Sequence, residues 1–185
     1  MLRWFRWFRW ALGGCLVLLT LCSASLVAQE PNWTQKNPAG RPSARWGHTM
    51  AYDAAHGQVV LFGGTDSTGY RNDTWVWNGM TWTQKTPANS PPLRSCQAMA
   101  YDAARREVVL FGGYDSDDAT RDRNDTWVWD GTNWTQKTPV NRPPGYQCPV
   151  MVYDAAREQV VLLESYVDRK RQRKPSVPRM NLVMK

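Results

Sequence analysis

The chain has 185 residues, the length of one domain, and a formal net charge of +7. That charge is concentrated at the two ends, because all 16 acidic residues lie from Glu30 to Asp168, whereas ten of the 23 basic residues lie outside that range. The middle of the chain is therefore slightly acidic. This excludes a broad phosphate-binding surface and predicts no specific nucleic-acid partner.

Residues 1–28 have the three parts of an export signal. Arg3, Arg6 and Arg9 form a positive start, residues 11–21 form an apolar run, and small residues that suit cleavage follow. We interpret the segment as a cleaved signal peptide, which predicts a secreted or periplasmic protein. The alternative is a retained N-terminal anchor, since tryptophan and phenylalanine alternate with the arginines. Only in that case would a membrane be a partner.

The rest of the chain contains phrases that repeat about every 50 residues. One is Tyr-Asp-Ala-Ala followed by an apolar run, a second is Trp-Thr-Gln-Lys, and a third is Asn-Asp-Thr-Trp-Val-Trp. They begin, respectively, at Tyr52, Tyr101 and Tyr153, at Trp33, Trp82 and Trp134, and at Asn72 and Asn124. Short β-type runs at this period are typical of propeller blades, so we expect most of the tryptophans to be architectural.

Each complete repeat predicts four antiparallel strands. They are expected at 46–53, 58–62, 74–77 and 81–85 in the first repeat, and at 95–102, 107–113, 126–129 and 133–137 in the second. The apolar second strand ends in a double glycine, where backbones crowd or φ turns positive. Asn-Gly at 78–79 and Asp-Gly at 130–131 predict tight turns before the fourth strand. Polar loops at 65–72 and 114–123 separate the second strand from the third.

The joint spacing of the double glycines and the tryptophans resembles that of kelch-repeat β-propellers, which include the central domain of galactose oxidase. The resemblance covers residues 31–163, and Arg45 and His48 match the family's start of the first strand. The structural motif residues are Gly63, Gly64, Trp75, Trp77, Trp82, Gly112, Gly113, Trp127, Trp129 and Trp134. The resemblance implies an all-β fold of four-stranded blades, whose loops form binding surfaces on a rigid scaffold.

The array of blades is incomplete. Residues 32–36 predict a lone fourth strand, two complete blades follow, and 147–154 and 159–163 predict two strands of a third blade, which gives eleven strands. A closed propeller needs at least about 16 strands, so we expect an open arc rather than a closed ring. The predicted regions are a signal or anchor at 1–28, a propeller fragment at 29–168, and a basic disordered tail at 169–185.

The break in the repeat after residue 163 has two explanations. One is a truncated or frame-shifted descendant of a longer propeller gene. The other is a short product whose open blade edges are capped by self-association. In either case the end faces of an open array expose apolar surface, and we expect the chain to associate with itself.

The loops between strands are where we expect a ligand to bind. Aromatic and acidic residues in these loops suit a protein or a glycan. The candidates are Trp46, Asp66, Tyr70, Tyr114, Asp115 and Asp117. The acidic residues clustered at 115–125 also suit calcium, but they lack an EF-hand pattern, so we interpret this stretch as a solvated loop.

No set of residues predicts catalysis or a cofactor. His48 and His56 are the only histidines, whereas a copper or zinc site uses several convergent imidazoles or thiolates. We find no nucleophile–base pair and no phosphate loop, and therefore predict a non-catalytic interaction module without catalytic, cofactor-binding or metal-binding residues. The alternative is a fragment of a secreted carbohydrate-active enzyme, of the galactose-oxidase or sialidase type, that lacks its catalytic blades.

Two cysteines remain after removal of the signal segment. Cys96 and Cys148 occupy equivalent positions of successive repeats. An oxidising compartment permits a disulfide. However, equivalent sites on neighbouring blades are expected near or beyond the roughly 7 Å between Cα atoms that a disulfide allows. We therefore predict free, half-buried thiols.

Overall fold

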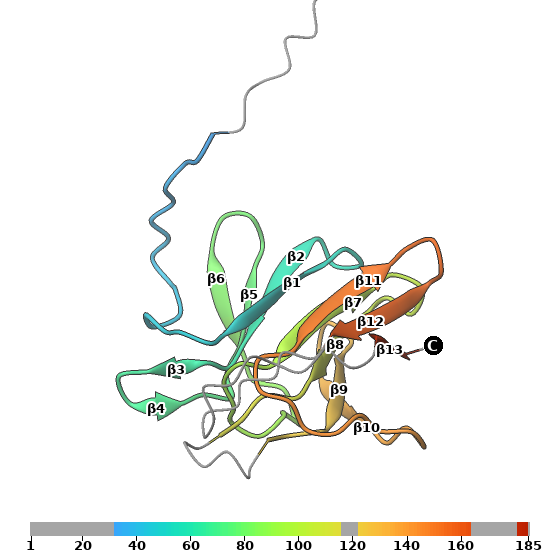
Figure 1. The fold of residues 1–185 in the computed structure, drawn as a ribbon. Coiled ribbons are helices and arrows are strands. Elements are labelled where there is room, and N and C mark those ends of the chain that lie inside the picture. The colour runs from blue at the N-terminus through green and yellow to red at the C-terminus, as the bar shows by residue number, and fades with distance from the viewer. Residues whose placement is uncertain (1–31, 116–121, 164–180, 185) are drawn as a thin grey trace, which may run out of the picture. The chain divides into compact units, whose positions relative to one another are not determined.

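The computed structural model describes residues 32–115, 122–163 and 181–184 (Figure 1). The chain falls into two units, residues 1–36 and 37–185. In the first unit only residues 32–36 are described. In the single chain they form no strand, which differs from the fourth-type strand predicted there. A strand needs a partner for its backbone groups, and no described strand pairs with this segment, in which Trp33 is 99% exposed.

Blade 1 is the first of three antiparallel blades in the second unit. In sheet order its strands are β1 (Thr49–Asp53), β2 (Gln58–Phe62), β5 (Thr74–Trp77) and β6 (Trp82–Lys85). The predicted loop between β2 and β5 contains a small hairpin that the sequence analysis missed. Its two strands are β3 (Thr65–Asp66) and β4 (Gly69–Tyr70).

Blade 2 repeats this sheet with the same register. Its strands are β7 (Ala98–Asp102), β8 (Glu107–Phe111), β9 (Thr126–Trp129) and β10 (Trp134–Lys137). Val108 lies opposite Trp129 in blade 2, as Val59 lies opposite Trp77 in blade 1. Both blades match the predicted strands to within three residues at each end, and among the described residues all regular structure is β. The predicted fold class is confirmed.

Blade 3 has three described strands. They are β11 (Val150–Asp154), β12 (Gln159–Leu163) and β13 (Asn181–Met184). We expected β13 to lie in a disordered tail, and for these four residues that prediction is wrong. The free edge of β12 offers a ladder of backbone hydrogen bonds, and β13 occupies it at the third-strand position. The rest of the predicted tail lies outside the described residues.

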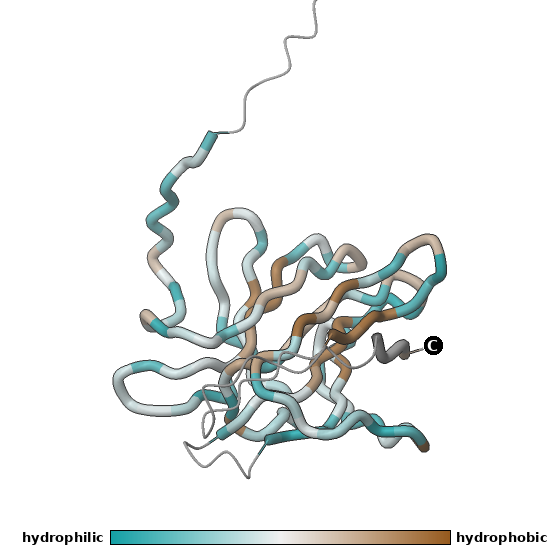
Figure 2. Tube along the Cα trace, viewed as in Figure 1, coloured by the Kyte–Doolittle hydropathy of each residue, from teal (hydrophilic) through white to brown (hydrophobic). Residues whose placement is uncertain are grey.

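The hydrophobic core lies between neighbouring blades. One buried cluster joins blades 1 and 2, and a second joins blades 2 and 3. Blade 2 is in the middle, because β7 contacts both β1 and β11, whereas β1 and β11 do not touch. Figure 2 shows the hydrophobic stretches running along the strands of these sheets. No described sheet closes on itself, so the three blades form an open array, as predicted.

The double glycines allow the backbone of the second strand to turn against the start of a first strand. Gly64 and Gly113 have φ values of 93° and 87°. A Cβ added at Gly64 would lie 2.8 Å from the carbonyl oxygen of Trp46, and one added at Gly113 would lie 2.7 Å from that of Ser95. Any other residue at these two positions would therefore meet backbone atoms.

Cys96 and Cys148 form a disulfide, so the prediction of free thiols is wrong. Their Cα atoms are 4.3 Å apart, closer than the general spacing of blades suggested. The cause is a shared turn before each first strand, in which Gly47, Cys96 and Cys148 all have positive φ. The amide of Cys96 donates to the Gly47 carbonyl at 2.7 Å, and that of Cys148 donates to the Cys96 carbonyl at 2.9 Å. Successive blades converge at these turns.

Candidate binding surface

A buried arginine fixes the loops of blade 1. Arg45 makes a two-pronged ion pair with Asp73, with Nη1–Oδ1 and Nη2–Oδ2 distances of 2.6 and 2.9 Å. Arg45 Nη1 also donates to the carbonyl of Gly63, and Asp73 accepts the indole N–H of Trp75 at 2.7 Å. The start of the first strand is thereby tied to the end of the second and the beginning of the third.

Blade 2 contains the same arrangement. Arg94, which is fully buried, pairs with Asp125 at 2.7 Å through both nitrogens and donates to the carbonyl of Gly112. Asp125 also accepts the indole N–H of Trp127. Burial alone would raise the pKa of Asp125, but the hydrogen bonds and charge of Arg94 hold that pKa below its ordinary value. The loops of both complete blades are therefore held rigidly.

Blade 3 lacks this ion pair. Tyr146 occupies the position of Arg45 and Arg94, since its carbonyl accepts the amide of Gly113 as that of Arg94 accepts the amide of Gly64. Its ring packs on Phe111 with 6.4 Å between centroids. The sequence pointed to Arg45 at the start of the first strand, but Asp73 and Asp125 were interpreted only as acidic loop residues and not as partners of the arginines. The repeated Asn-Asp-Thr-Trp phrase carried that signal, because the aspartate recurs two residues before each tryptophan.

The predicted ligand residues of blade 1 lie on its hairpin or directly beside it. Trp46 pairs with Thr65 through backbone hydrogen bonds in both directions, at 3.0 and 2.9 Å, and is 55% exposed. Asp66 accepts hydrogen bonds from Arg71, Ser43 and Thr68, which lower its pKa well below the usual range. Trp46 is therefore available to a ligand, whereas the Asp66 carboxylate already has its partners.

The equivalent loop of blade 2 contacts that hairpin. Tyr70 and Tyr114 meet edge to face with ring centroids 6.0 Å apart. Tyr114 is buried and supports the contact, while Asp115 forms an ion pair with Arg123. Asp117 lies outside the described residues. The structure therefore brings five of the six predicted ligand residues to neighbouring loops of blades 1 and 2.

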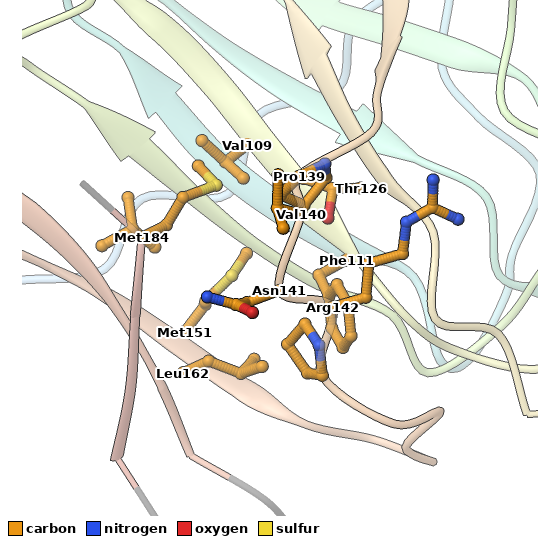
Figure 3. Close-up of a pocket in the computed structure, with 12 residues that line it drawn as sticks. Val109, Phe111, Thr126, Pro139, Val140, Asn141, Arg142, Met151, Leu162 and Met184 are labelled. Atoms are coloured by element: carbon orange, nitrogen blue, oxygen red, sulfur yellow. The ribbon is translucent and has the colours of Figure 1, made fainter.

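The described part of the second unit contains a polar hollow and an apolar one. The polar one, about 480 Å³, is beside the blade 2 loop and contains Asp115, Asp122, Arg123 and Asp125. Within the described ranges no three His, Cys, Asp or Glu side chains gather closely enough to hold a metal ion. The apolar one, about 370 Å³, lies between blades 2 and 3. Figure 3 shows Met151, Leu162 and Met184 of blade 3 facing Val109 and Phe111 of blade 2 across it.

Residues 20–159 match the model of the KLHDC2/KLHL20/DRC7 Kelch-repeats domain. The chain belongs to the kelch-repeat family. Kelch repeats generally mediate protein–protein interaction, and the kelch family is generally non-catalytic, so membership suggests a protein-interaction module. The comparison with curated proteins found no match.

The candidate surface described above therefore lies on the blades of a kelch-repeat domain. The two arginine–aspartate pairs fix the strand ends of two neighbouring kelch blades, and the loops joined by the Tyr70–Tyr114 contact lie at one end of these blades. In the part of the chain that the structure describes, no helix has the length and apolarity to cross a membrane.

Proposed function

We propose that this chain is an exported kelch-repeat module that binds a partner protein through the loops of blades 1 and 2. The observation that carries the proposal is the contact between Tyr70 and Tyr114, which joins two loops into one surface. Trp46 lies beside these loops with an exposed side chain, and its backbone is fixed by two hydrogen bonds to the backbone of Thr65. Exposed tryptophans on rigid elements are frequent anchors of protein interfaces.

A binding screen tests this proposal. The chain is applied to a displayed peptide library and to a printed glycan array, because aromatic loops also suit glycans. We expect peptide binding that Trp46→Ala weakens at least about tenfold, the effect of losing a moderate anchor. Met80→Ala is the control, since Met80 is also apolar and exposed but lies in the tight turn of blade 1. Binding to glycans alone, or binding indifferent to Trp46, contradicts the proposal.

Export is supported by the sequence of residues 1–28 and by the Cys96–Cys148 disulfide, which suits an oxidising compartment. Fractionation of expressing cells, with mass spectrometry of the mature N terminus, tests it. A chain that keeps residues 1–28 in the membrane fraction would support the anchor instead.

The lineage of the chain and its possible enzymatic origin have separate tests. We infer descent from a longer propeller gene, because no Asn-Asp-Thr-Trp-Val-Trp phrase follows the third Tyr-Asp-Ala-Ala. Translation of all frames downstream of the locus should then contain further kelch phrases.

Release of peroxide by the chain with added copper would favour the alternative function, a fragment of a secreted carbohydrate-active enzyme.

Open blade edges are also expected to drive self-association. Apolar side chains of β1 and β11, including Met50, Tyr52, Val150 and Val152, are more than half exposed on the end blades. Light scattering on the purified chain tests for association.

A further inference from the structure

Trp134 shows how a fourth strand seals the space between two kelch blades. It lies on β10 of blade 2, yet its ring packs edge to face on Phe62 of blade 1, with centroids 5.3 Å apart. Its indole N–H donates to the hydroxyl of Thr74 in blade 1 at 2.9 Å. The side chain is completely buried. The fourth-strand tryptophan of one blade therefore fills a hole in the face of the blade before it.

The apolar pocket between blades 2 and 3 is the same hole without a tryptophan. From blade 2 it is lined by Val109, Phe111 and Thr126, the repeat equivalents of Val60, Phe62 and Thr74. From blade 3 it is lined by Met151, Val160 and Leu162, the equivalents of Met99, Val108 and Leu110, which form one cluster with Trp134. We call these six residues, from Val109 to Leu162, the tryptophan socket.

The strand that would carry the missing tryptophan has a defined place. Met184 lies opposite Val160, as Trp129 lies opposite Val108, so β13 has the register of a third strand. In blade 2 the next strand places Trp134 opposite Trp129. Among the described strands none pairs with the outer edge of β13. A fourth strand added there would place its tryptophan opposite Met184, which lines the pocket.

The chain contains a third copy of the fourth-strand sequence. Residues 32–36 read Asn-Trp-Thr-Gln-Lys, identical to residues 133–137, and they lie outside every described sheet. The other two copies each lead through a linker into the next blade, so this copy is the fourth strand of the blade that precedes blade 1. We propose that this blade is blade 3 of a second copy, and that two copies close into one six-bladed propeller.

Strand counting selects two copies. With residues 32–36 as a strand, each chain contributes three blades of four strands. Closed propellers have about four to eight blades, so one copy gives too few, two give six, and three give about nine, which is too many. A pair of this kind has twofold symmetry, with each chain filling the socket of the other.

The exposed end faces support the same arrangement. Met50 on β1 is 52% exposed, whereas its equivalent Met99, which meets a preceding blade, is 8% exposed. On the other end, Val152 is 59% exposed and its equivalent Ala100, which meets a following blade, is 6% exposed. The two open faces are therefore the two kinds of face that meet inside the chain.

Polar contacts of blade 2 predict matching ones across the interface. The amide of Asn89 donates to the side-chain oxygen of Asn133 at 2.9 Å. Asn141 is the equivalent of Asn89 and lines the pocket, and Asn32 is the equivalent of Asn133. The amide of Asn141 is expected to donate to Asn32 of the second copy, and the indole of Trp33 to the hydroxyl of Thr126.

Light scattering on the purified chain, in the form that the expressing cell produces, tests the proposal. The proposal rests on the self-association proposed above and names the site where it occurs. We expect twice the mass of one chain, and we expect Trp33→Ala to weaken association of the two copies about 100-fold and shift the chain towards monomer, as for a buried interface tryptophan. Met80→Ala is the matched control and should remain a dimer. Circular dichroism should show both variants folded, because Trp33 and Met80 are exposed in the single chain.

Cysteine pairs test the register. By analogy with blade 2, where Thr135 lies opposite Val128, Thr34 should lie opposite Val183 of the other copy. Thr34→Cys with Val183→Cys should cross-link two chains, and Thr34→Cys with Asn181→Cys should not. If Trp33→Ala does not weaken association, or if both cysteine pairs cross-link equally, the two-copy ring is wrong, although the chain still self-associates. A monomer overturns both, and a trimer or open filament overturns the ring.

Discussion

Trp134→Ala should destabilise the chain far more than the same change at its repeat equivalent, Trp82. Trp134 is fully buried against Phe62 and Trp129 and donates to Thr74, whereas Trp82 is only partly buried and contacts Trp77 of its own blade. Removing a fully buried tryptophan costs its transfer free energy and leaves a cavity, about 4 kcal/mol of unfolding free energy. The partly exposed Trp82 should cost about 1–2 kcal/mol.

Urea unfolding followed by circular dichroism measures both values. The Trp33→Ala background is used, so that association does not contribute to the measured free energy. Trp134→Phe should recover part of the loss, because a smaller ring still fills part of the hole without the hydrogen bond to Thr74. Equal costs for Trp82 and Trp134, or less than about 1 kcal/mol for Trp134→Ala, would refute the assigned role of Trp134 between the blades.

Three further predictions concern the ion pairs and the disulfide. Arg94→Met should cost about 3 kcal/mol of unfolding free energy, because it leaves Asp125 largely buried without its cation, and adding Asp125→Asn should recover part of that cost in a double-mutant cycle. The stability that Asp125 contributes is present above about pH 4 and is lost as pH falls through its lower folded pKa; Asp125→Asn should therefore flatten the fall of the urea midpoint between pH 5 and pH 2. Reduction of Cys96–Cys148, which closes a separation of 52 residues, should cost about 4 kcal/mol, and an unchanged urea midpoint with reductant would contradict the disulfide.

The sequence predicted the elements that depend on local pattern. The strands of blades 1 and 2 follow from short apolar runs bounded by glycine and by Asn-Gly or Asp-Gly turns, and each of these signals lies within the strand or beside it. The kelch assignment followed because several such signals recur at one period. The loops of the predicted ligand residues were found for the same reason, since they are the polar stretches between predicted strands.

The features that depend on distant partners were not predicted. β13 is a strand because β12 offers a free edge, and the local sequence of Asn181–Met184 contains no signal that predicts this pairing. The Cys96–Cys148 distance depends on how closely the turns of successive blades converge, which a repeat period does not contain. The roles of Asp73 and Asp125 required knowing which arginine lies across the blade.

Tyr146 bears on the history of the third blade. In blades 1 and 2 a buried arginine at this position is matched by an aspartate before the third strand, and an arginine left without its aspartate would be a buried unpaired charge. The third repeat has neither the arginine nor the aspartate phrase, and an aromatic ring packed on Phe111 stands in the arginine's place. Loss of both partners is the state expected of a blade whose sequence has adapted to its altered third strand.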